Sequence, residues 1–248
     1  MPTMADSLEV GGVEYAWHTD VGRVRARNED SVAVDAGLGL LVVADGMGGH
    51  NAGDVASRMA IEGVLGAMRG SDGDADDRLL SAVRRANEAI YAAAGEDYDR
   101  SGMGTTVVAA WLRPDRLVVA HVGDSRLYRL RGGALAALTR DHTEVQDLVD
   151  RGILTPAQAR VSTRRNFLSR ALGTYPEVDI DCAVHPPEPG DVYLLCSDGL
   201  TNMLEDADIV AIIAGAASLA MAAELLVARA NEQGGRDNIS VALARLAQ

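Results

Sequence analysis

The stretch TTVVAAWLRPDRLVVAHVGDSRLYRLRGGALAALT, residues 105–139, alternates apolar runs with short turns. It divides into Thr105–Arg113, Arg116–Val122 and Ser125–Thr139, each rich in Val and Leu and soon followed by Gly or Asp. Apolar runs of this kind, bounded by turn residues, predict β-strands. The turns are too short to hold the crossover helices of a parallel sheet, so we expect these strands to be antiparallel.

Two further strand clusters lie on either side of this stretch. They comprise Glu14–Thr19 with Ser31–Asp45, and Asp191–Ser197 with Ile239–Leu246. Helical patterns fall between the clusters, at Asp54–Met68, about Asp76–Glu96, about Asp206–Ala214 and Leu219–Glu232. Strand runs interrupted by pairs of helices predict an α+β fold, a four-layer α-β-β-α sandwich of two antiparallel sheets flanked by helix pairs.

The 248 residues, 48% of them hydrophobic, suit one large domain over residues 1–248. Arg140–Leu172 is polar, is broken by Gly152 and Pro156, and lies between two strand clusters, so we expect a small mobile flap inserted over a site. Met1–Val10 is acidic and lacks the apolar core of an export signal. We expect it to be a short flexible lead-in.

Charge and cysteine content restrict the partners. The formal charge is −13, every basic residue is Arg, and no basic run is present, which argues against nucleic acid. Ile209–Ala223 is uncharged but shorter than the roughly 20 residues that span a bilayer. Cys182 and Cys196 are too few for a disulfide framework. We expect buried, reduced thiols and a cytoplasmic, monomeric protein.

Four aspartates occupy similar places in the pattern. Asp45, Asp124 and Asp198 each end an apolar run beside Gly, and Asp237 opens one. One such acid is usually a turn residue, but four predict a carboxylate cluster. Converging carboxylates need a compensating cation, and Mg²⁺ or Mn²⁺ fits oxygen ligands. The chain has no Cys-x-x-Cys and no His-rich spacing, which argues against structural zinc.

Two alternative motifs are weaker. Asp45-Gly-Met-Gly-Gly49 could open a dinucleotide fingerprint, but the last required glycine is Asn51 and Asp45 would repel a pyrophosphate. A metal loop explains the glycines better, because Gly46 lets its carbonyl approach an ion. Ser71–Asp77 resembles the start of a calcium loop, but it lacks the required Gly and Glu, so a solvated linker is favoured.

The assembled segments resemble the bacterial members of the type 2C (PPM) family of metal-dependent serine/threonine protein phosphatases. The resemblance runs from Val13 to Leu246 and follows family order, and the ordered set is far more specific than any one part. The matching segments are Arg25–Asp30 (RARNED), Asp45–His50 (DGMGGH), Gly104–Thr106 (GTT), Val122–Arg126 (VGDSR), Ser197–Gly199 (SDG) and Gly235–Asn238 (GRDN).

The resemblance implies a metal site. Asp45 would bridge two Mn²⁺ or Mg²⁺ ions, with the Gly46 carbonyl and Glu29 (partly through water) serving one of them. Asp198 and Asp237 would serve the other. Asp124 would anchor a third, weaker ion that it shares with Asp198.

The resemblance also implies the chemistry. Arg25 would hold the substrate phosphate with its planar fork, unless it merely pairs with Glu29 or Asp30. Water between two cations loses its proton easily, so a metal-bridging hydroxide would hydrolyse phosphoserine and phosphothreonine in proteins. Hydrolysis would be a single displacement without a covalent intermediate. The enzyme would reverse bacterial Ser/Thr kinase signalling. A binding-only pseudophosphatase and a hydrolase of other phosphoesters are the competing functions.

The histidines are less informative. Animal relatives have His directly after Asp-Gly, where this chain has Met47. His50 could protonate the leaving oxygen or could simply cap the loop, and both interpretations stay open. We expect His121, which follows an apolar run, to pack beneath Asp124 rather than react, and His142, at the start of the flap, to be exposed.

Overall fold

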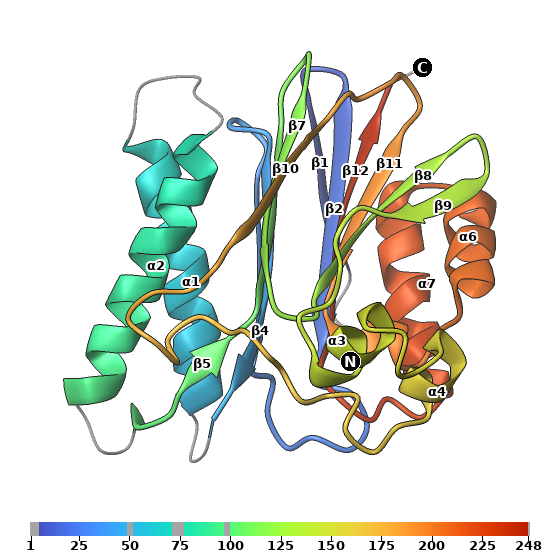
Figure 1. Cartoon of the computed structure of the whole chain (residues 1–248). Coiled ribbons are helices and arrows are strands. Elements are labelled where there is room, and N and C mark those ends of the chain that lie inside the picture. The colour runs from blue at the N-terminus through green and yellow to red at the C-terminus, as the bar shows by residue number, and fades with distance from the viewer. Residues whose placement is uncertain (1–4, 49–51, 71–76, 97–99, 248) are drawn as a thin grey trace.

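Two antiparallel sheets lie face to face between two helical layers in the computed structural model (Figure 1), which describes residues 5–48, 52–70, 77–96 and 100–247. The first sheet has the order β1-β2-β12-β11-β8-β9. Its strands are β1 (Asp6–Val10), β2 (Val13–Asp20), β8 (Arg126–Arg131), β9 (Ala134–Ala137), β11 (Val192–Cys196) and β12 (Ile239–Leu246).

The second sheet has the order β10-β7-β6-β4-β3, with β5 paired to β4. Its strands are β3 (Asp30–Asp35), β4 (Leu40–Met47), β5 (Gly104–Thr105), β6 (Val107–Leu112), β7 (Leu117–Val122) and β10 (Asp181–His185). Helices α1 (Ala52–Arg69) and α2 (Asp77–Glu96) cover its outer face, while α6 (Asp206–Gly215) and α7 (Leu219–Glu232) cover the first sheet (Figure 1). The predicted four-layer α+β sandwich is confirmed.

Strand β4 shows how the sequence builds these layers. Successive side chains of a strand point to opposite faces. Leu40 and Val42 therefore join the core under α1 and α2, whereas Leu41 and Val43 join the core between the two sheets. All four are fully buried, which explains why this strand is a continuous apolar run rather than an alternating one.

Turns divide two runs that we expected to be single strands. Ser31–Asp45 forms the hairpin β3–β4, with Gly39 at φ +71°, and Ser125–Thr139 forms β8–β9, with Gly132 and Gly133 at φ +56° and +81°. Glycine adopts positive φ at little cost, so these residues reverse the chain inside an otherwise continuous run.

Two expectations about exposed segments were wrong. The lead-in is not flexible throughout, because Asp6–Val10 forms β1 and pairs with β2 through a turn at Gly11 and Gly12; residues 1–4 lie outside the described part. Cys182 is exposed on β10, whereas Cys196 is buried as expected. Both thiols are free.

The flap segment, residues 140–172, contains two short helices, α3 (Glu144–Asp150) and α4 (Pro156–Arg160). Thr143 caps α3, and Thr155 with Gln158 forms a capping box at α4. Both helices lie at the end of the molecule where β4 ends (Figure 1). Among the described helices, none combines the length and hydropathy that crossing a bilayer requires.

Candidate active site

Asp45 lies near the end of β4, where its backbone is fixed on both sides. Its N–H donates to the Thr106 hydroxyl (2.9 Å), and its carbonyl accepts from the Thr106 N–H (2.9 Å) and the Thr105 hydroxyl (2.9 Å). These bonds occur because β5 and the start of β6 run beside the end of β4. The Asp45 side chain is thus carried on a rigid strand end.

Gly46 lies where β4, the Glu29 backbone and the start of α1 meet. A Cβ at Gly46 would lie 2.1 Å from the Gly53 carbonyl oxygen and 2.6 Å from the Glu29 carbonyl oxygen, so only glycine fits. A Cβ at Gly53 would in turn be 3.0 Å from the Glu29 carboxyl carbon. Glu29, Asp45 and Gly46 are therefore brought together, as the predicted ligand set requires.

Asp198 and Asp237 come from neighbouring strands of the first sheet. Asp198 follows β11 as the first residue of α5 (Asp198–Thr201), and Asp237 precedes β12, which pairs with β11. The two loops touch, because a Cβ at Gly199 would lie 1.9 Å from the Asn238 carbonyl oxygen. Asp198 Oδ2 accepts from the Asn202 side chain (2.9 Å), while its Oδ1 is buried without a partner.

Arg25 pairs with Asp237. Its Nη2 lies 2.7 Å from Asp237 Oδ2, and about half of the Arg25 side chain (52%) is exposed. We had weighed Glu29 and Asp30 as its ionic partners, and the structure places the arginine on a predicted metal ligand instead. It thus lies at the edge of the acidic cluster.

Asp124 follows Gly123 in the turn between β7 and β8 and is 9% exposed. The Ser125 hydroxyl is 2.7 Å from the Thr106 hydroxyl, which is the group that accepts from the Asp45 backbone. One threonine therefore links the turn that carries Asp124 to the strand that carries Asp45.

Electrostatics show that these carboxylates converge. Burial raises the pKa of Asp45 well above its usual value. Repulsion from four other carboxylates raises it further, namely Asp30, Asp198, Asp124 and Asp237. Burial, followed by repulsion from Asp237, raises the pKa of Asp198 to about 6. Burial and the charges of Asp198 and Asp141 also raise the pKa of Asp124, although Arg126 opposes this.

The site contains residues to which the sequence had assigned no role. Asp30 pairs in register with Asp45, is 8% exposed and accepts from the Ser197 hydroxyl (2.7 Å). Asn238 accepts from the Glu29 N–H (2.8 Å) through Oδ1. Both belong to the matching segments, and their position beside Glu29 and Asp237 was the available signal.

The donor set fits a hard divalent ion. Partly buried carboxylates that repel one another favour a cation with oxygen ligands, and Asp198 Oδ1 is a buried acceptor without a partner among the described residues. Among the described residues, no three of these carboxylates present oxygens within 4.8 Å of one another.

The predicted histidines are distributed differently. His50, the candidate general acid, lies outside the described residues. His121 is 1% exposed, as expected for a core residue. His142 is 5% exposed, so the expectation that it is exposed was wrong; it packs against the turn before Asp124, a contact between residues too far apart in sequence to be read from local pattern.

The family model for "Protein phosphatase 2C" matches residues 22–243, nearly the whole chain. The chain belongs to the protein phosphatase 2C family. Among curated members, the serine/threonine phosphatase Stp of Listeria innocua is 39% identical over 92% of this chain and 93% of that protein. PstP of Mycobacterium tuberculosis is 43% identical over 94% of this chain but only 45% of its own length.

Solved structures of the phosphatase 2C family agree with the fold. The crystal structure of M. tuberculosis PstP has a TM-score of 0.89 at 41% identity, covering 95% of this chain and 99% of that one. The catalytic domain of PstP in complex with two manganese ions has a TM-score of 0.86 at 39% identity, covering 99% and 100%. The resemblance seen in the sequence is confirmed.

Proposed function

We propose that this member of the protein phosphatase 2C family is a metal-dependent serine/threonine phosphatase acting on phosphorylated proteins. The observation that carries the proposal is the convergence of the half-buried Asp45 and Asp198 with the buried Asp124, because the pKa values of all three are raised. A cluster this unfavourable as bare carboxylates is explained by the cations it binds. The manganese complex of the PstP catalytic domain supports the same choice of ion.

Asp45, Gly46, Glu29, Asp198 and Asp237 would hold two Mn²⁺ or Mg²⁺ ions, and Asp124 with Asp198 would hold a third. When bound, such ions lower the pKa of coordinated water and neutralise phosphoryl oxygens, so hydroxide is available at neutral pH. The chain's own residues would contribute by positioning the substrate and stabilising its charge.

Arg25 would orient the substrate. Among the described residues its guanidinium donates to Asp237 alone, which leaves further N–H groups for a phosphate. A planar fork binds a tetrahedral anion with two parallel hydrogen bonds. His50 would protonate the leaving oxygen, with a loop cap as its alternative role. The flap segment, which lies at the same end of the molecule, would contact the protein that carries the phosphate.

The proposal is tested with Asp45→Asn and Asp237→Asn, each of which removes one anionic ligand and keeps the shape of the side chain. We expect Mn²⁺-dependent turnover of a phosphoserine or phosphothreonine peptide to fall by about 100-fold or more, with weaker Mn²⁺ binding by calorimetry. Asp115→Asn is the matched control, because the Asp115 side chain is 70% exposed and its ionic partner among the described residues is Arg116 in the same turn.

Two results would contradict the proposal. Wild-type Mn²⁺ binding in both site variants would refute their role as ligands. Phosphopeptide hydrolysis that persists undiminished in chelator would refute metal dependence. A panel that also contains nucleotides and phosphodiesters separates a protein phosphatase from a hydrolase of other phosphoesters.

A further inference from the structure

His142, the third residue of the flap segment, holds both backbone polar groups of the residue before Asp124. Its N–H donates to the Gly123 carbonyl (2.8 Å), and its Nδ1 accepts from the Gly123 N–H (3.1 Å). Gly123 has φ +109°, and a Cβ there would lie 2.6 Å from the Thr106 Cβ. The conformation of this glycine sets the direction in which the chain enters Asp124.

The other side of the His142 ring meets two charged residues. Nε2 lies 3.1 Å from Asp181 Oδ2 on β10 and 3.3 Å from Arg170 Nη1. Arg170 also donates to Asp181 Oδ1 at 2.8 Å. The Ser169 N–H donates to the His142 carbonyl (2.9 Å), so the two ends of the flap segment meet at this one histidine.

The hydrogen bonds fix the tautomer of the ring. A backbone amide only donates, so Nδ1 of His142 carries no proton and Nε2 carries it toward Asp181. Burial lowers the pKa of His142, and the charge of Arg170 lowers it further, although Asp181 opposes the shift. The ring is therefore neutral and is oriented by a partner on each side.

His142 and Asp181, together with the neighbouring His121, superficially resemble a metal site. Among the described residues, His121, His142 and Asp181 alone offer three ligand atoms within 4.8 Å of one another. Coordination through Nε2 would require His142 to lose its remaining proton, and Arg170 already neutralises Asp181. The group is better explained as a hydrogen-bonded support than as a place for a cation.

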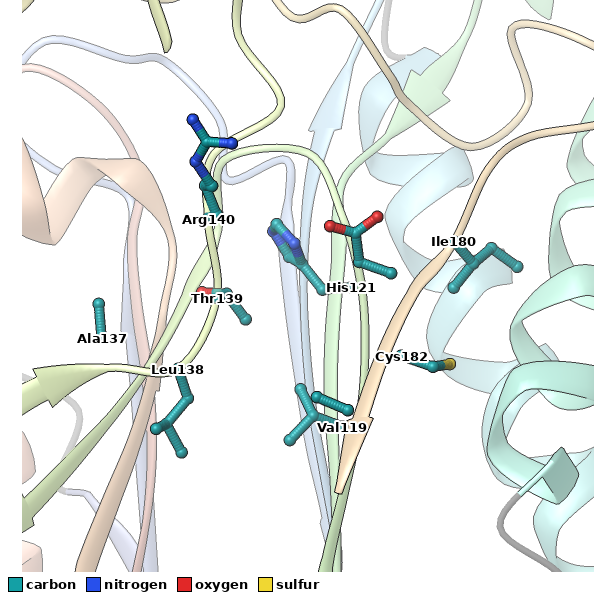
Figure 2. Close-up of a pocket in the computed structure, with 10 residues that line it drawn as sticks. Val119, His121, Ala137, Leu138, Thr139, Arg140, Ile180 and Cys182 are labelled. Atoms are coloured by element: carbon teal, nitrogen blue, oxygen red, sulfur yellow. The ribbon is translucent and has the colours of Figure 1, made fainter. Parts of the chain in front are cut away.

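His121 and a cavity border this support. The two imidazole rings lie 4.7 Å apart, and among the described residues neither nitrogen of His121 has a hydrogen-bond partner. A cavity of about 570 Å³ is lined by His121, and Figure 2 shows the His121 ring between Arg140 on one side and Ile180 on the other. Asp181 lines this cavity and its side chain is 55% exposed, so it can be replaced without disturbing a core.

We propose that His142 is a positioning residue for Asp124, and that Arg170 and Asp181 orient it for that task. This inference rests on the proposed function, because Asp124 is taken there as the anchor of a third, weaker ion. It adds that hydrogen bonds join the two ends of the flap segment, at His142 and Arg170, to the turn that carries Asp124. Partners that orient a metal ligand typically affect metal affinity by about 10- to 100-fold when removed.

Two substitutions at His142 separate its contacts. His142→Leu fills the space but removes both side-chain bonds. His142→Asn keeps an acceptor on Cγ, where Nδ1 is attached, and loses the reach to Asp181. We expect the weak Mn²⁺ site to lose about 10-fold or more in affinity in His142→Leu and to be partly restored in His142→Asn. The two tightly bound ions should keep their affinity in both variants.

Two substitutions outside the core keep the proposal testable if His142→Leu does not fold. Asp181→Ala and Arg170→Ala remove the orienting partners, and we expect each to weaken the same site by about 3- to 10-fold. Arg164→Ala is the matched control, because Arg164 is also a flap arginine with an exposed ion pair, and its partners among the described residues are Glu144 and the Phe167 ring. It should bind Mn²⁺ as the unaltered protein does.

The readout is calorimetric titration with Mn²⁺ alone, together with water-proton relaxation by bound Mn²⁺, neither of which needs turnover. Asp124→Ala is titrated alongside. If Asp124→Ala weakens the site but His142→Leu binds Mn²⁺ as the unaltered protein does, the positioning role alone is overturned. If His142→Leu does not fold, wild-type affinity in both Asp181→Ala and Arg170→Ala has the same consequence. An unaltered protein with no weak site, or an unchanged one in Asp124→Ala, would overturn the third ion and this inference with it.

Discussion

At the scale of single residues, Asp30 places a second carboxylate opposite Asp45 on the paired strand. Burial, and then repulsion from Asp198 and Asp237, raises its pKa to about 7, although the Ser197 hydroxyl opposes the shift. Its Oδ1 is buried without a partner. The stability of the metal-free protein should therefore depend on pH in a range where most proteins show little change.

The sign follows from the direction of the shifts. A carboxyl whose folded pKa exceeds its unfolded value binds protons more readily when folded, so stability rises as pH falls through about 7 for Asp30. His121 acts in the opposite direction: burial lowers its pKa to about 4, so acidification below its unfolded value of about 6.5 favours unfolding. We expect stability in chelator to keep increasing as pH falls from 8 to about 5, because the raised pKa values of Asp45, Asp124 and Asp198 add to that of Asp30 and together outweigh His121.

Thermal unfolding in chelator across this range measures the effect. Asp30→Asn should reduce the increase below about pH 7, because it removes one titrating group while keeping an acceptor for Ser197. Added Mn²⁺ should stabilise the protein most at pH 8. A protein whose metal-free stability grows from pH 5 to pH 8 would show that these carboxyls do not repel one another as described.

Arg25 gives a second prediction at this scale. Arg25→Ala should raise KM for a phosphopeptide by about 10-fold, with kcat also falling to the extent that the fork tightens on the transition state. Arg25→Lys keeps the charge but not the two parallel donors, so it should recover only part of the loss. Steady-state kinetics with exposed Arg27→Ala as the control measures this. Unchanged kcat/KM in Arg25→Ala would leave Arg25 as a surface residue.

At the scale of elements, Asn238 pins the loop that carries Arg25 and Glu29. Its Oδ1 accepts from the Glu29 N–H, and its Nδ2 donates to the carbonyls of Val21 (2.9 Å) and Arg27 (2.8 Å). Asn238→Ala removes all three bonds and should cost about 3 kcal/mol, at about 1 kcal/mol for each. Asn238→Asp keeps the acceptor but sets a carboxylate oxygen against the two carbonyls, so it should cost more than the loss of the two donor bonds alone. Denaturant unfolding checks both, and a cost below about 1 kcal/mol for Asn238→Ala would contradict the pinning.

The flap segment should open more easily than the layers beneath it. Only Val145 is buried in α3, and no residue is buried in α4, so little apolar burial holds these short helices. The ends of the segment differ, because the amides of His142, Ser169 and Leu172 donate to backbone carbonyls outside the helices. Hydrogen exchange should be fast in residues 144–160 and slow at those three amides. Protection of α4 equal to that of α7 would contradict this.

The same elements show what the sequence can and cannot predict. The buried strands were found because apolar side chains on both faces leave an uninterrupted run, as in β4. β1 and β10 were missed because they are short and largely exposed, so no such run marks them. The strand-end aspartates stood out beside glycine, whereas the burial of His142 depends on Gly123, Arg170 and Asp181, which no local pattern connects to it.

At the scale of the whole molecule, the net charge of −13 bears on the choice of substrate. A strongly negative protein attracts cationic partners and repels anionic ones over about one Debye length. Phosphopeptides flanked by Arg or Lys should therefore show higher kcat/KM than those flanked by Asp or Glu. The ratio should shrink as salt rises from about 0.05 M to about 0.5 M, because screening removes the difference. Equal salt dependence for both peptides would show that local contacts decide instead.

The two cysteines make this fold convenient to label. Cys196 lies in the core with its pKa raised by burial to about 12, whereas Cys182 is an exposed thiol on β10, next to Asp181. A maleimide dye should therefore attach at one known position without any engineered cysteine. Because that position adjoins the cavity beside the flap segment, its fluorescence would report when a phosphopeptide or an ion alters this corner of the molecule.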